Sequence, residues 1–232
     1  MRSRVLLPLA ALAAASAWCV VLLVVRRHEF GYSGYPYLVW NLTLAWIPLV
    51  LAVLLVRSYE RRRSPVELLA VGAAWLVFLP NAPYVLTDFI HLGERHRLFD
   101  TLLIASFAFT SLALGFASLL LVQLVVTRAA GAMIGWATAL ASLFAASVGI
   151  YLGRVLRFNS WDVVHRPGRL WEISTARLAD PFGNRYLIVF VFGLSGFLMM
   201  AYLGMVGFTA LVGAAQRREP PVLGSDRTWP SP

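Results

Sequence analysis

The sequence contains no lysine and a single cysteine, Cys19, and charged residues make up only 13% of it. A soluble domain carries roughly 25% charged residues, so this composition argues against a soluble fold. One cysteine cannot form an internal disulfide, which excludes a disulfide-stapled scaffold. The chain also lacks the alternation of apolar and polar positions, in segments of roughly ten residues, that marks the strands of a transmembrane barrel. These absences point to a helical membrane protein.

Long apolar runs are the main feature that is present: 59% of the 232 residues are hydrophobic. The runs reach about twenty residues, enough for a helix to cross a ~30 Å hydrocarbon core. We therefore predict an all-α integral membrane protein, a bundle of about six transmembrane helices in a single domain, residues 1–215, with a disordered polar tail at residues 216–232. The predicted spans are residues 5–25, 36–56, 66–92, 99–126, 130–152 and 187–213. The first run is longer than a signal-peptide core, so we expect it to be retained.

The formal charge of +9 comes from 20 arginines against 11 acidic residues. The arginines lie mainly at the ends of the predicted spans, where they meet phosphate headgroups, so we expect membrane lipids and not nucleic acid as partners. In a six-span topology ten arginines fall on each side of the membrane, and the positive-inside rule is tied. If Arg154 and Arg157 continue the fifth helix and are not counted, both termini are placed in the cytoplasm.

The third predicted span contains two prolines, Pro80 and Pro83, which predict a break within the membrane because proline removes a backbone donor and clashes with the preceding turn. Asn81 is placed to cap the restarted helix. Beyond the break, Asn81, Tyr84, Asp88 and His91 follow the spacing i, i+3, i+7 and i+10, which is one face of an α-helix, and Thr87 borders that face. Ionisable residues at membrane depth face the bundle interior or a water-filled cavity.

A second polar cluster lies at the end of the fifth predicted span, where Arg154, Arg157 and Trp161 share a face if the helix continues. The ends of the third and fifth spans emerge on the same side of a six-span protein. We therefore predict an ion pair between Asp88 and either Arg154 or Arg157. Guanidinium groups also suit phosphate and carboxylate ligands, although anchoring to lipid headgroups explains these arginines equally well.

Glycines spaced one turn apart occur at both ends of the fifth span, as Gly131/Gly135 and Gly149/Gly153. This spacing lets helix backbones approach closely in lipid. It predicts that the fifth helix is central in the bundle, and it offers glycine-rich faces for a homo-oligomer.

Asp88-x-x-His91 is echoed by Asp162-x-x-His165, and two Asp/His pairs can supply four metal ligands. No longer metal motif accompanies them. We therefore predict no metal site and no cofactor, and Asp88 and His91 are the residues to examine if a metal does bind.

Two strings carry a family resemblance: Leu-Pro-Asn-Ala-Pro-Tyr-x-x-Thr-Asp-x-x-His-Leu at residues 79–92, and Gly-Arg-x-x-Arg-x-Asn-Ser-Trp-Asp at residues 153–162. Both resemble the signature of a bacterial membrane protein family, domain of unknown function 1361, from about the second helix to the sixth. The resemblance implies a multi-pass protein of the bacterial cytoplasmic membrane and assigns no activity. The matching positions are Asn81, Pro83, Tyr84, Thr87, Asp88, His91, Arg154, Arg157, Asn159, Trp161 and Asp162.

Three function classes remain. The first is a protein that binds or moves a polar, anionic ligand between the third and fifth helices, because a broken helix with polar residues at the break is a common transporter site. The second is a membrane-embedded enzyme acting on a lipid headgroup or lipid-linked substrate, with Asp88 and His91 as acid and base. Ser160 and Thr87 lack the activating neighbours of a nucleophile, so enzymatic activity stays open. The third is a structural scaffold, in which Asn81 only caps, Tyr84 and His91 lie at the interface, and Asp88 is the hardest residue to explain. The residues assigned to the polar site are Asn81, Tyr84, Thr87, Asp88, His91, Arg154, Arg157, Asn159, Trp161 and Asp162.

Overall fold

The computed structural model describes residues 2–31, 35–93, 96–155 and 185–217, together with four single residues between the last two ranges. All secondary structure in these residues is helical. The elements are α1 (Arg2–Phe30), α2 (Tyr37–Glu60), α3 (Pro65–Phe78), α4 (Asn81–Tyr84), the 3₁₀ helix η1 (Val85–His91), α5 (Arg97–Ala130), α6 (Ala132–Val155) and α9 (Arg185–Arg217).

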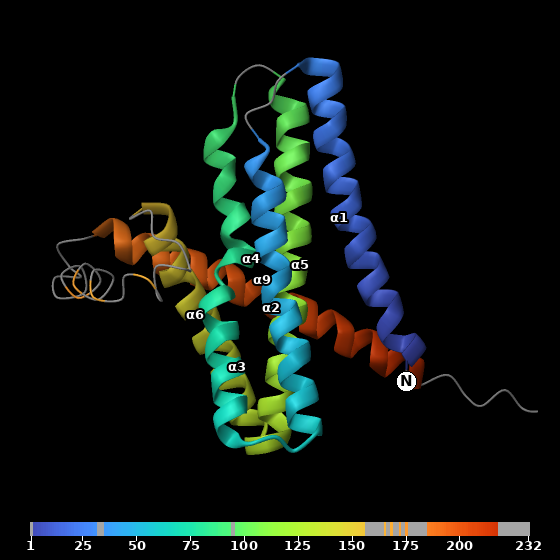
Figure 1. Cartoon of the computed structure of the whole chain (residues 1–232), viewed down its shortest axis with the longest axis vertical. Coiled ribbons are helices and arrows are strands. Elements are labelled where there is room, and N and C mark those ends of the chain that lie inside the picture. The colour runs from blue at the N-terminus through green and yellow to red at the C-terminus, as the bar shows by residue number, and fades with distance from the viewer. Residues whose placement is uncertain are drawn as a thin grey trace, which may run out of the picture.

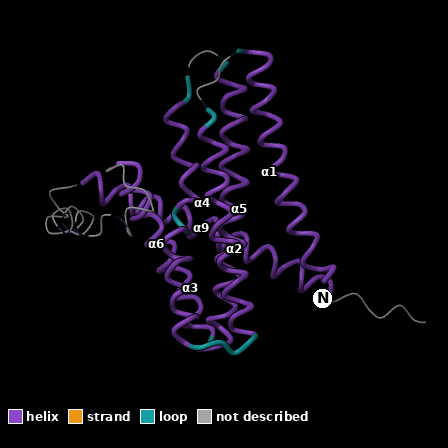
Figure 2. The backbone as a smooth tube through the Cα atoms, in the orientation of Figure 1, coloured by secondary structure: helices purple, strands orange, loops and turns teal. Residues whose placement is uncertain are grey.

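The helices form six segments that are long and apolar enough to cross a membrane: α1, α2, the run from α3 to η1, α5, α6 and α9. The predicted all-α class with six spans is therefore confirmed. Figure 1 shows α2, α3 and α5 standing side by side, with α1 leaning away from α5 toward its N-terminal end and α9 crossing the bundle obliquely. The tube in Figure 2 shows how short the loop between α2 and α3 is.

The fourth span, α5, is the centre of the bundle. It contacts α1, α2, α6 and the α4–η1 region, and it buries a larger share of its residues than any other candidate span. The prediction that the fifth span is central was wrong, because glycine spacing reports close approach to one neighbour and not the number of neighbours. Gly149 makes such an approach: a Cβ there would lie 2.6 Å from Pro80 Cγ. Gly131 does not pack a helix face but forms the turn between α5 and α6, with a positive φ of 94°.

The predicted break in the third span is present at Leu79 and Pro80, between α3 and α4. The backbone stays in the right-handed helical region there, with Pro80 at φ −57° and ψ −26°. It then tightens into the 3₁₀ helix η1. The break therefore removes hydrogen bonds without turning the chain aside, and the third span continues to His91.

The predicted capping role of Asn81 was wrong, because the chain never adopts the extended conformation of an N-cap residue before α4. Instead, Asn81 Nδ2 donates to the carbonyl oxygen of Phe78 at 2.9 Å. The amide of Ala82, the usual partner of that carbonyl, donates to Leu79. Asn81 thus satisfies a carbonyl that the break deprives of its helical partner.

Candidate functional site

Arg154, in the last turn of α6, is the centre of a polar cluster formed with η1. Its Nε donates to Thr87 Oγ1 at 2.7 Å, its Nη2 forms an ion pair with Asp88 Oδ1, and its Nη1 lies 3.2 Å from His91 Nε2. The face of the guanidinium lies on the ring of Tyr84, with Cζ 4.4 Å from the ring centroid. The predicted pairing of Asp88 with Arg154 is present in the structure.

The tight winding of η1 explains why three of its side chains, together with Tyr84 of α4, reach one arginine. A 3₁₀ helix has about three residues per turn, so residues three apart are stacked. Tyr84 and Thr87 form one column, and Asp88 and His91 form the column beside it. The sequence analysis assumed an α-helix with about 3.6 residues per turn and placed Thr87 at the border of the polar face. In the structure Thr87 contacts Arg154 directly.

Asp88 is almost fully buried, with 1% of its surface exposed. A buried carboxylate needs partners for both oxygens. Oδ1 receives Arg154, and Oδ2 receives a hydrogen bond from Asn41 Nδ2 on α2 at 3.1 Å. Asp88 therefore ties η1 to both α2 and α6.

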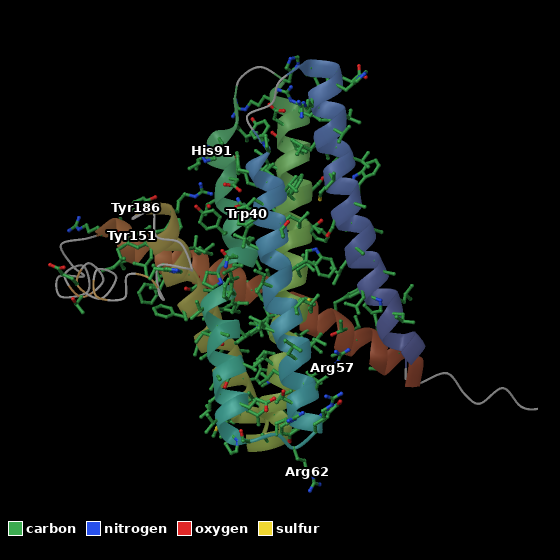
Figure 3. All side chains as sticks on the ribbon, viewed as in Figure 1. Trp40, Arg57, Arg62, His91, Tyr151 and Tyr186 are labelled. Carbon is green, nitrogen blue, oxygen red and sulfur yellow. The ribbon has the colours of Figure 1, made fainter. Side chains whose placement is uncertain are left out.

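His91 is exposed at the end of η1, and Figure 3 shows it on the same side of the bundle as Tyr151 and Tyr186 of α6 and α9. Arginine can only donate hydrogen bonds, so His91 Nε2 is the acceptor in its contact with Arg154. The ring of Tyr37 meets His91 edge-on at 5.7 Å. The buried Tyr37 hydroxyl has no hydrogen-bond partner in the part of the chain that the structure describes.

The described residues occupy only part of the Arg154 guanidinium. The group carries five N–H donors, of which Thr87, Asp88 and His91 take one each. One N–H on each terminal nitrogen has no partner among the described residues. The side chain is 17% exposed, so the protein positions the guanidinium without enclosing it completely.

A second buried ion pair lies next to this cluster. Arg26 of α1 contacts Asp100 of α5 through Nε at 2.5 Å and Nη2 at 3.3 Å, and both residues are less than a tenth exposed. The hydroxyl of Tyr35 donates toward Asp100 Oδ2 and lies at the same 3.2 Å from the carbonyl oxygen of His91. Burial, and then the Asp100 carboxylate, raise the pKa of Tyr35, which keeps its hydroxyl protonated. Tyr35 thereby links the two ion pairs.

Comparison with known proteins identifies a family for this chain. The model of the family described as protein of unknown function (DUF1361) matches residues 40–201. The chain belongs to this family. No curated protein and no solved structure matches the chain. The DUF1361 match includes Asn41, Asp88, His91, Asp100 and Arg154, whereas the first span and the two tyrosines of the α1–α2 connection lie before it.

The structure brings together five of the predicted site residues of this DUF1361 protein. They are Tyr84, Thr87, Asp88, His91 and Arg154. Asn81 donates to the backbone of α3. Arg157, Asn159, Trp161 and Asp162 lie outside the described residues.

Sequence reasoning missed Asn41, Tyr37, Tyr35, Arg26 and Asp100. Asn41 had a signal, since it is a lone amide within an otherwise apolar stretch of the second span. Arg26 was interpreted as a residue that ends the first span, and Asp100 as the start of the fourth. Only the packing of α1 on α5 shows that the two charges meet.

The donor set does not favour a metal at Asp88 and His91. The described ranges contain no group of three or more histidine, cysteine, aspartate or glutamate side chains placed to hold an ion. Both oxygens of Asp88 already have partners, and His91 Nε2 faces a guanidinium.

Proposed function

We propose that this membrane protein binds or moves a polar ligand with an anionic group, and that Arg154 and His91 receive that group between the third and fifth spans. The observation that supports this proposal is the guanidinium of Arg154, which is fixed by Thr87, Asp88 and Tyr84 and keeps an N–H on each terminal nitrogen. Paired N–H donors of arginine match phosphate and carboxylate oxygens.

A structural scaffold is the second candidate, because the three side-chain contacts of Arg154 are all made within its own chain. In that case the cluster only joins η1 to α6. The two functions differ in whether an added anion stabilises the protein.

We expect anions to raise the thermal unfolding temperature of the purified full-length protein, because a ligand that binds only the folded state stabilises that state. The probes are inorganic phosphate, pyrophosphate and succinate, each compared with sodium chloride at equal ionic strength. An anion at about 100 times its Kd adds roughly 2.7 kcal/mol of stability.

The matched control is Asp88→Asn/Arg154→Gln, which removes the guanidinium together with its counter-ion. Stabilisation by the anion should then be lost. If no anion stabilises the wild-type protein, the scaffold function replaces the ligand-binding one.

A further inference from the structure

The connection between α2 and α3 carries the densest positive charge among the described residues. Arg57, Arg61, Arg62 and Arg63 lie within seven positions, with Glu60 as the single acid, so residues 57–63 carry a net charge of +3. All four arginines are exposed, and none forms an ion pair within the described part of the chain. Four guanidinium groups are thus held close together with their charge uncompensated.

This connection is an ordered turn. The amide of Arg63 donates to the carbonyl of Ser58 at 3.0 Å, and Ser64 caps α3 by accepting from the amide of Glu67 at 3.2 Å. Ser58 Oγ also donates to Glu67 Oε1 at 2.9 Å, which joins the end of α2 to the start of α3. Because both spans end here, the arginines stand at the level of the lipid headgroups.

At the opposite end of the bundle, some arginines are paired with acidic side chains. Two of the ten arginines assigned to that side, Arg26 and Arg154, form ion pairs with Asp100 and Asp88. Their positive charge is thereby compensated within the protein. The ten-to-ten tie in the sequence therefore becomes ten to eight in favour of the side that carries the α2–α3 turn. Figure 3 shows Arg57 and Arg62 toward one end of the bundle and His91 toward the other.

We infer that the α2–α3 turn binds the phosphate groups of anionic phospholipids and holds its end of the bundle at the cytoplasmic leaflet. Cytoplasmic leaflets carry anionic lipid, and each nearby arginine strengthens the attraction. The Arg154 cluster then opens toward the opposite side of the membrane. This assignment does not depend on what the Arg154 cluster binds.

Lipid selectivity tests the binding surface. The full-length protein is placed in phosphatidylcholine vesicles, and the immobilised fractions of spin-labelled phosphatidylglycerol and phosphatidylcholine are compared by electron paramagnetic resonance. We expect a preference for phosphatidylglycerol that Arg61→Gln/Arg62→Gln/Arg63→Gln reduces by about fivefold or more, since even one arginine near the surface contributes about fivefold. The matched control, Arg27→Gln/Arg97→Gln/Arg185→Gln, removes three exposed arginines from the other end and should retain most of the preference. Equal losses in the two variants, or no preference in the wild type, overturn the proposal.

Orientation is tested with single cysteines at the two ends of α5, Leu98→Cys and Ala129→Cys, both at exposed positions. The native Cys19 is fully buried and serves as the unlabelled background. In intact cells that produce the protein, a membrane-impermeant thiol reagent should label the Leu98→Cys variant. It should label the Ala129→Cys variant only after the cells are lysed. The reverse pattern would place the turn outside and overturn the assignment.

Discussion

Replacing Asp88 with alanine should lower the free energy of unfolding by roughly 3–5 kcal/mol, because it leaves the guanidinium of Arg154 without its counter-ion in a largely buried site. Asn41 loses its acceptor in the same change. The measurement is unfolding of the purified protein in mixed micelles of increasing sodium dodecyl sulfate content. The value should lie toward the lower end of the range, since the Arg154 side chain keeps 17% of its surface in contact with solvent.

The control for this prediction is the neutral pair Asp88→Asn/Arg154→Gln, which removes both charges and keeps two side chains that can hydrogen-bond. It should recover more than half of the stability that Asp88→Ala loses. A double variant no more stable than the single one would show that the Asp88–Arg154 contact is not what holds η1 against α6.

The second large effect is expected at the other ion pair. Asp100→Ala should also cost roughly 3–5 kcal/mol, and more than Asp88→Ala, because Arg26 is only 7% exposed and its Nη1 already lacks a partner among the described residues. The hydroxyl of Tyr35 loses an acceptor as well. The same micelle titration measures the loss.

The control for the Asp100→Ala prediction is the neutral pair Arg26→Gln/Asp100→Asn. If the buried charge of Arg26 causes the loss, this neutral pair should be clearly more stable than Asp100→Ala. Equal stability of the two variants would instead attribute the loss to packing between α1 and α5, which also includes the contact of Cys19 with Thr110 at 3.4 Å.

The two ion pairs form one polar layer at one end of the bundle. Tyr35 contacts both Asp100 and the backbone of His91, while the side chain of His91 contacts Arg154. The layer therefore extends from α1 through α5 and η1 to α6. His91 is the exposed member of this layer, so we expect a ligand to reach the layer beside it.

The Asp88–Arg154 pair could be predicted from the sequence because topology alone places the ends of the third and fifth spans on one side. A carboxylate within a span also requires a partner. The arrangement of the individual contacts could not be predicted. It depends on how the end of α6 packs beside η1 and on the 3₁₀ winding of η1, and the spacing of the polar residues reveals neither.

The Arg26–Asp100 pair was not predicted for a different reason. Arginines and acids near span ends are ordinarily solvated at the headgroups, so their sequence positions carry no sign of burial. The pair exists because α1 packs on α5 along the part of its length that contains Arg26. Helix neighbours of this kind follow from tertiary packing and not from apolar runs.

Native mass spectrometry of protein extracted gently from its own membrane tests the proposed ligand site most directly. The wild type is compared with Asp88→Asn/Arg154→Gln and with the matched neutral pair Arg26→Gln/Asp100→Asn, which retains the Tyr35 hydroxyl. A bound anionic species on the wild type and on the Arg26/Asp100 variant, absent from the Asp88/Arg154 variant, is the predicted result. A ligand that stays bound to the Asp88/Arg154 variant, or a wild type that carries none, would contradict it.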